Sequence, residues 1–451
     1  MFRTMPRVQP ASRIALRGTL VSFTGDPFLV DPDEAVTQES DGLLVCRDGS
    51  IEAFGPYHSL RRELPADVPI TDYSGCIISA GFIDAHIHYV QTGIIAAPGK
   101  RLLDWICDYV YPVEEGFAGE AHARAVASFF CDTLLSNGTT TASVYCAVYP
   151  QSVDALFAEA EKRNMRMIAG KCMMDRNVPE ALRDTAKTGY DQSKALIGKW
   201  HGKGRLLYAI TPRWAGSSTP AQLEAAGSLW REHPRLHVQT HIAETQEELA
   251  FIAKLFPERK DFLDVYEHYG LIGRRAVLGH AIWFSESEFC RCHEREASIA
   301  HCPTSNMFLG SGLFRLRHAK DRNRPIHVGI GTDIGAGTSF SQLATLNAAY
   351  KVAALNAAPI TAFEGLYLAT LGGARALDLD DRIGSLRPGR EADLVVLDPA
   401  ATPLLAFRTA RSQSLEETLF ILMTLGDERA VRATYIGGAL AHARPATPVD
   451  A

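Results

Sequence analysis

Residues 79–88 read Ser-Ala-Gly-Phe-Ile-Asp-Ala-His-Ile-His, an apolar run that ends in His86 and His88 with one residue between them. In a β-strand, residues i and i+2 point to the same side, so both imidazoles would face one point. Two neutral imidazoles that converge at a strand end are a suitable start for a zinc site. A histidine pair on a solvated strand face would have the same pattern, so the rest of the chain must decide.

Length and composition limit the class of protein. The 451 residues exceed the usual size of one domain, which favours one large domain with a smaller one. A net charge of −6 gives no basic surface, so we expect no nucleic-acid partner. No apolar run approaches the roughly 18 residues of a membrane span, so we expect no membrane partner. The nine cysteines are scattered without a C-x-x-C motif, which favours a reducing, cytoplasmic location.

Both ends of the chain are rich in short strands and turns. Strand patterns before the His-x-His and near the C-terminus occupy residues 14–21, 42–46, 50–55, 72–78, 392–398 and 431–438. Asp48-Gly49 is a hairpin turn signal between two of them. We expect residues 1–78 and 376–451 to contribute strands to one small sheet.

The middle of the chain, residues 79–375, alternates strand-like runs with amphipathic helical segments. Helical patterns include residues 151–163, 219–232 and 246–255. Strand patterns occupy residues 77–84, 139–147, 166–174, 206–211, 237–242, 276–280, 298–301 and 327–332. This repetition indicates a parallel sheet, and eight such strands close a (β/α)8 barrel of the TIM type. The predicted fold class is therefore α/β.

The ends of the predicted barrel strands carry polar residues. Chemistry in such a barrel sits at the C-terminal ends of the strands. A single strand-end histidine is more often structural, but several at one rim indicate a metal site. The strand-end residues are His86 and His88 on the first strand, His241 and Glu244 on the fifth, His280 on the sixth, His301 and Asn306 on the seventh, and Asp333 on the eighth.

This ordered set, a His-x-His followed by His, His and Asp at later strand ends, resembles the amidohydrolase superfamily. The resemblance is closer to one of its families, the guanine deaminases. It is carried by residues 81–92, 102–105, 111–114, 211–214, 239–244 and 298–306. Two positions depart from the family pattern: Trp214 stands where Phe is more usual, and Val90 where a Pro or small polar residue is expected. Neither position is a metal ligand.

The resemblance implies a catalytic barrel and a composite β-sandwich domain built from both chain ends, in a homodimer. It implies hydrolytic deamination of guanine at C2 to xanthine and ammonia, in purine catabolism or salvage. Another aminohydrolase of the same barrel, acting on 8-oxoguanine, a triazine or an adenosine derivative, is the nearest alternative. A relative that has lost its metal and serves as an assembly protein is an alternative of a different class.

The expected metal ligands are three histidines and one aspartate, which leave a coordination position open for water. We assign His86, His88, His241 and Asp333 as ligands of one zinc ion per chain. Iron(II) is an alternative metal for the same nitrogen and oxygen donors. Zinc lowers the pKa of bound water, and the resulting hydroxide would attack the ring carbon that carries the amine.

Glu244 is the candidate proton shuttle, because it lies three residues after His241 and can face the substrate side of the metal. It would take the proton of the water and give it to ring nitrogen N3. Asp333 would help to carry a proton to the departing ammonia. His280 would hydrogen-bond the attacking oxygen or the tetrahedral intermediate. Glu244 and His280 are therefore expected to contact the substrate as well.

Substrate choice is expected away from the metal. Arg213 offers a planar fork of donors, Gln91 offers a donor and an acceptor, and the resemblance places both in the guanine pocket. Trp214, Trp105 and Leu103 are candidate apolar walls or stacking faces. Binuclear members of the superfamily bridge two metals with a carboxylated lysine at a barrel strand end, but His241, Glu244 and His280 fit the mononuclear layout. We therefore expect Lys171, on the third strand, to be structural or salt-bridged.

Overall fold

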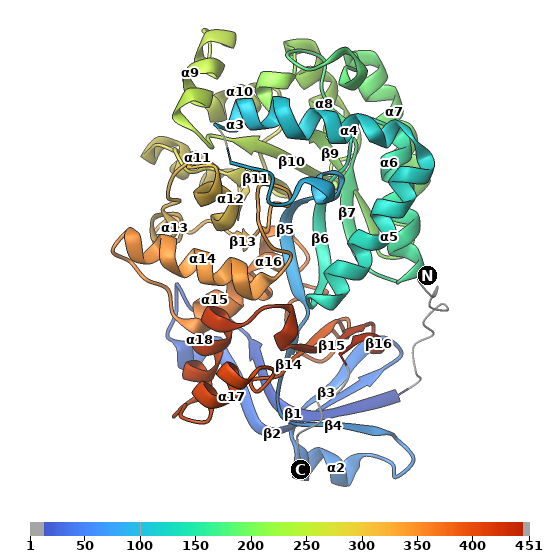
Figure 1. Ribbon diagram of the computed structural model, residues 1–451, viewed down its shortest axis with the longest axis vertical. Helices are drawn as coiled ribbons and strands as arrows, with labels where there is room; N and C mark the ends of the chain where they lie inside the picture. The colour runs from blue at the N-terminus through green and yellow to red at the C-terminus, as the bar shows by residue number, and fades with distance from the viewer. Residues whose placement is uncertain (1–12, 100, 445–451) are drawn as a thin grey trace.

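In the computed structural model, which describes residues 13–99 and 101–444, eight parallel strands form a nearly closed barrel (Figure 1). Neighbouring strands are hydrogen-bonded in chain order, and a short strand, β8 (Cys172–Met173), pairs with β9 beside this path. The barrel strands are β5 (Phe82–His88), β6 (Thr139–Tyr145), β7 (Arg166–Gly170), β9 (Leu206–Pro212), β10 (His237–Ile242), β11 (Ala276–His280), β12 (Ser298–His301) and β13 (Val328–Ile330). The predicted (β/α)8 fold class is confirmed.

The first barrel strand differs from the prediction at 77–84. Gly81 divides this stretch: β4 (Ile70–Ala80) belongs to another sheet, and β5 begins at Phe82. A Cβ atom at Gly81 would lie 2.3 Å from Thr140 Oγ1, so glycine allows the close approach to β6. The apolar run continues through both sheets, and its period does not record where the hydrogen-bonding partner changes.

The barrel closes between its last and first strands at the end that carries the histidines. Asp333 N, just after β13, donates to His86 O at 2.9 Å. His88 N donates to Ile334 O at 3.0 Å. These backbone hydrogen bonds fix the two histidines of β5 relative to Asp333.

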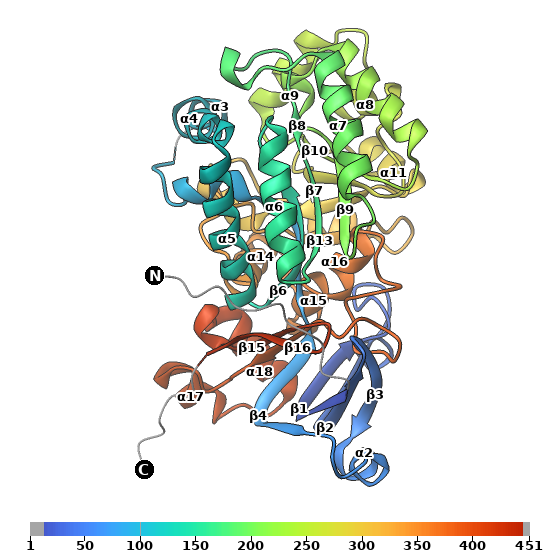
Figure 2. The same ribbon diagram turned by 90° about the vertical axis from the view of Figure 1, so that its right-hand side faces the viewer.

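Amphipathic helices cover the outside of the barrel (Figure 2). Among them α6 (Pro150–Lys162), α8 (Pro220–Glu232) and α9 (Gln246–Leu255) agree with the predicted helical segments. α5 (Glu120–Ser136), α6, α7 (Ala186–Trp200) and α8 pack side by side in chain order. No helix among the described residues is long and apolar enough to cross a membrane.

Both chain ends build the second sheet, below the barrel in Figure 1. Asp48 and Gly49, both with positive φ, form the predicted hairpin turn between β2 (Val36–Arg47) and β3 (Ser50–Pro56). One apolar cluster takes side chains from β2 and β3 at one edge and from β15 near the other, so the sheet folds over itself as a small sandwich. The order is β16 (Ala439–Ala443), β15 (Val431–Ile436), β14 (Leu394–Leu397), β4, β1 (Arg13–Phe23), β2 (Val36–Arg47) and β3 (Ser50–Pro56).

One segment between β5 and α5 lies across the C-terminal end of the barrel, at the front of Figure 1. It contains a 3-10 helix, η1 (Tyr89–Ile94), followed by α3 (Leu102–Trp105), a π-helical turn, η2 (Ile106–Val110), and α4 (Tyr111–Glu115). π-helical turns occur frequently at functional sites. This segment forms the roof of the cavity described next.

Candidate active site

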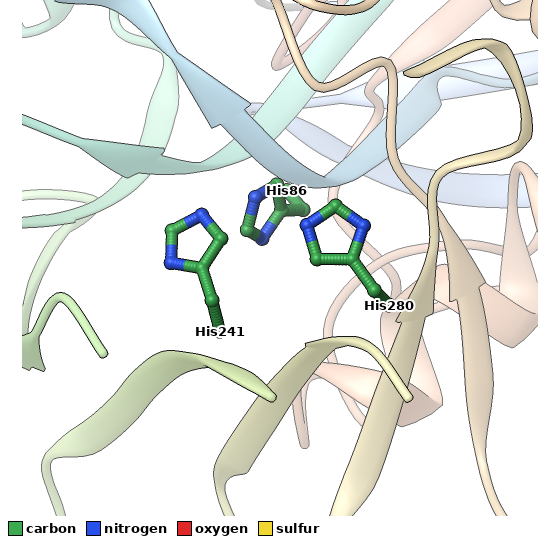
Figure 3. Close-up of side chains that lie close together, drawn as sticks. All are labelled: His86, His241 and His280. Carbon is green, nitrogen blue, oxygen red and sulfur yellow. The ribbon is translucent and has the colours of Figure 1, made fainter. Parts of the chain in front are cut away.

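Four predicted metal ligands meet at one end of the barrel. His88 Nε2 lies 3.1 Å from His241 Nε2, and Asp333 Oδ1 lies 3.3 Å from His86 Nε2 and 3.4 Å from His88 Nε2. Figure 3 shows His86 from β5, His241 from β10 and His280 from β11 around one small space. Residues more than 240 positions apart in the sequence thus offer donor atoms to one point.

The chemistry of these donors fits a metal ion. His86 Nε2 is buried, and its polar neighbour is the carboxylate of Asp333, another predicted ligand. His241 Nδ1 donates to Arg213 O at 2.7 Å, which leaves its Nε2 as the ligand atom. Burial lowers the pKa of His86 and, further, those of His88 and His241, so the rings are neutral, as a metal requires. Neutral imidazoles and a carboxylate suit zinc or iron(II).

The backbone around the cluster is shaped for close contact. His280 and Asp333 have φ values of 76° and 53°, in the left-handed region that non-glycine residues seldom adopt. Cβ atoms at Gly279 and Gly331 would lie 2.7 and 2.8 Å from the His86 side chain. Where the imidazoles converge, the strand ends therefore contain strained backbone at two residues and glycine at two others. Such strain is common at functional sites.

Glu244 and His280 form a second polar pair beside the metal ligands. Glu244 Oε2 lies 3.4 Å from His280 Nε2, and Ser311 Oγ donates to Glu244 Oε1 at 2.9 Å. His280 Nδ1 donates to Asn306 Oδ1 at 2.9 Å, so its Nε2 faces the carboxylates. Burial raises the pKa of Glu244. Burial opposes a charge on His280, but Glu244 and Asp333 raise its pKa, so the pair can hold and exchange a proton.

Glu248 was not predicted as a site residue, although its buried side chain lines the same cavity. Its Oε2 accepts a hydrogen bond from Glu244 N at 2.7 Å, and burial raises its pKa to about 7. Thr245 Oγ1 accepts from Glu248 N at 3.1 Å as the N-cap of α9. The Thr-x-x-Glu capping pattern was the available sequence signal for a fixed glutamate here.

Gln91 and Arg213 meet through Glu114, which lies in the motif at residues 111–114 and was not predicted as a site residue. Arg213 Nη1 donates to both Glu114 oxygens, at 2.8 and 2.7 Å, and Gln91 Nε2 donates to Glu114 Oε1 at 3.1 Å. Gly335 N donates to Gln91 Oε1 at 3.2 Å. The Gln91 carbonyl is therefore already used, and this wall presents N–H donors from Gln91 and Arg213 to a ligand.

Most of these groups line one cavity, which holds about 510 Å³ of empty space when its opening to solvent is included. Trp214 lines it and stacks on Phe251, with ring centroids 5.8 Å apart. Trp105 and Leu103 both belong to α3 of the roof segment, and Trp105 is buried there. The lining residues named so far are His88, Gln91, Leu103, Trp105, Arg213, Trp214, His241, Glu244, Glu248, His280 and Asp333.

Two other candidates have structural surroundings. Lys171 is buried in an ion pair with Asp184, so the expectation of a salt-bridged lysine is confirmed. His301 is fully buried and packs on Phe314, with ring centroids 4.9 Å apart. Burial lowers its pKa to about 3. Of the two residues predicted at the end of the seventh strand, Asn306 is thus the one whose side chain bonds to a site residue, His280.

Several known proteins are similar to this chain in sequence and in fold. A family model described as the amidohydrolase family matches residues 77–441. Guanine deaminase of Escherichia coli (strain K12) is 47% identical over 433 residues, covering 95% of this chain and 98% of that protein. The solved structure of E. coli guanine deaminase has a TM-score of 0.93, with 96% of this chain and 100% of that chain covered.

A crystal structure of guanine deaminase from C. acetobutylicum, with guanine bound in its active site, is 26% identical and has a TM-score of 0.85. That likeness covers 95% of this chain and 99% of the other. The chain therefore belongs to the amidohydrolase family and, within it, to the guanine deaminases.

Proposed function

We propose that this protein hydrolyses guanine at C2, with release of xanthine and ammonia. The observation that carries the proposal is one cavity lined by members of a buried His–Asp cluster, by the Glu244–His280 pair and by Gln91 and Arg213, which Glu114 holds from behind. The first can hold a metal, the second can move protons, and the third can orient a purine. The guanine deaminases of similar sequence support the same reaction.

We propose one zinc ion per chain, held by His86, His88, His241 and Asp333, with iron(II) as the alternative. The converging and buried donor atoms of these residues support this assignment. A bound zinc ion supplies Lewis acidity and lowers the pKa of a water ligand. Burial opposes a charge on Asp333, but hydrogen bonding to His86 and the nearby His280 lower its pKa, so Asp333 retains its carboxylate charge.

The proton steps belong to Glu244, His280 and Asp333. Glu244 accepts a proton from the attacking water and delivers it to N3 of the ring, so negative charge does not accumulate there. Its raised pKa, caused by burial, suits a group that must both take and give a proton near neutrality. His280 stabilises the oxygen that adds to C2, and Asp333 helps to protonate the departing amine.

The donor wall sets the substrate. Guanine has a carbonyl group and ring nitrogens that accept hydrogen bonds, and Gln91 and Arg213 offer N–H groups to them. Triazines and adenosine derivatives lack a ring carbonyl, so they leave part of this wall unpaired, which is costly in a buried site. Trp214, Trp105 and Leu103 cover the faces of the flat ring.

The proposal extends to the organisation of the enzyme. We propose a cytoplasmic homodimer with a catalytic barrel over residues 79–375 and a sandwich from residues 1–78 and 376–451. Residues 79 and 80 end β4 of the sandwich sheet, and residues 1–12 and 445–451 lie outside the described residues. The family resemblance supports the dimer, and light scattering of the purified protein would measure it.

Steady-state release of ammonia from guanine tests the activity, with 8-oxoguanine, a triazine and adenosine as comparison substrates. We expect the highest kcat/KM for guanine. Guanine turnover no faster than that of the comparison compounds would contradict the substrate assignment. Metal analysis runs in parallel, and a protein without stoichiometric zinc or iron, not activated by added metal, would contradict the metal assignment.

A further inference from the structure

The Glu114–Arg213 pair places two opposite charges in the wall of the substrate cavity. Glu114, on α4, has no exposed surface, and Arg213, just after β9, is 5% exposed. Both oxygens of Glu114 accept from Arg213 Nη1. The pair is therefore desolvated, and its net contribution to the charge of the wall is zero. Without Glu114, a buried guanidinium would face the ligand uncompensated.

The other titratable groups around the pair do not replace Glu114. Burial raises the pKa of Tyr111, on α4, to about 12 and that of Cys172, on β8, to about 12, so both remain neutral. On the metal side, the Arg213 guanidinium interacts electrostatically with the proposed metal ligands His86 and His88. Glu114 is thus the carboxylate, among the described residues, that is bonded to the Arg213 guanidinium.

The charge of this wall matters because substrate and product differ in acidity. Guanine is neutral at physiological pH. In xanthine a second carbonyl replaces the amine, so the ring loses a proton more readily and spreads the negative charge over two oxygens. A buried guanidinium without a partner binds such an anion strongly, through charge-assisted hydrogen bonds in a medium of low dielectric constant.

We propose that Glu114 is a specificity-determining residue that cancels the charge of Arg213, so that the cavity accepts neutral guanine and rejects the xanthine anion. This inference rests on the proposed function. Glu114 acts through Arg213 and Gln91, whose N–H groups it also orients, and its position on the roof segment brings it into contact with both. The pair would thereby favour release of the product.

The test compares the metal-loaded wild-type protein with Glu114→Gln, which has nearly the same size but no charge. Calorimetry measures the Kd of xanthine and of hypoxanthine, a purine that stays neutral over the same pH range. The compared quantity is the ratio of the hypoxanthine Kd to the xanthine Kd. Above the pH at which xanthine ionises, we expect this ratio to be at least about tenfold larger in the variant than in the wild type, or about 1.4 kcal/mol. A ratio equal to that of the wild type, at every pH, would overturn the proposal.

Glu114→Asp is the conservative control, because it retains the charge. We expect this variant to bind both purines more weakly but to keep the wild-type ratio of their Kd values. A ratio like that of Glu114→Gln would overturn the proposal. If Glu114→Gln does not fold, the wild type alone decides. Its preference for xanthine over hypoxanthine must fall as the pH rises through the ionisation of xanthine, and a rise would refute the idea. These binding ratios do not depend on turnover, so failure of the proposed reaction is detected separately by the guanine assay.

Discussion

Replacement of Glu244 by Gln separates proton transfer from structure. Ser311 Oγ donates to Glu244 Oε1 at 2.9 Å, and the amide oxygen of Gln can accept the same hydrogen bond. The other oxygen faces His280 Nε2 at 3.4 Å, a distance that an amide group also tolerates. Since the shape and the Ser311 bond are retained, we expect the free energy of unfolding to change by no more than about 1 kcal/mol, the net value of one hydrogen bond.

The expected loss is in turnover. A positioned general acid–base group contributes about 10²–10⁴-fold to the rate, so kcat should fall by that factor. This corresponds to about 3–5 kcal/mol of activation free energy, several times the expected change in stability. The metal content should remain close to that of the wild type, because Glu244 is not an expected metal ligand.

Steady-state kinetics of xanthine formation, metal analysis and thermal unfolding of the same preparations check this expectation. Glu247→Gln is the matched control: it makes the same change three residues away, on an exposed side chain in the first turn of α9. Near wild-type kcat is expected for that control. A kcat of Glu244→Gln within a few-fold of the control would refute the shuttle role. A loss of bound metal or of folding stability in Glu244→Gln large enough to account for the loss of kcat would also refute the reasoning.

Three further predictions test other parts of the site. Arg213→Ala should raise the KM for guanine at unchanged metal content, and should destabilise the fold by about 3–5 kcal/mol, because Glu114 loses its buried partner; kinetics and denaturant unfolding measure these effects. Lys171→Met should destabilise by a similar amount through the unpaired Asp184 but keep full metal content, whereas loss of metal would identify Lys171 as a ligand. Chelation should abolish activity and lower the Tm, since a ligand at 1,000 times its Kd stabilises by about 4 kcal/mol, and added zinc should restore both.

The sequence alone predicted the barrel and its reactive rim. Each strand and helix carries its own hydrophobic period, and the segments around α6, α8 and α9 were placed almost to the residue. Parallel strands in a barrel bring their C-terminal ends to one face, so His86, His241 and Asp333 could be predicted as neighbours despite their separation. Local pattern and one topological rule were sufficient.

Only the tertiary structure decided the contacts that give the rim its chemistry. Glu114 and Arg213 are 99 positions apart, and their pairing depends on how the roof segment packs over β9. The use of the Gln91 carbonyl by Gly335 N, and the division of the first strand at Gly81, have the same origin. Such contacts arise from burial between distant segments and leave no period in either one. The sequence determined that His86 and His88 end a barrel strand, and packing decided which charges face them.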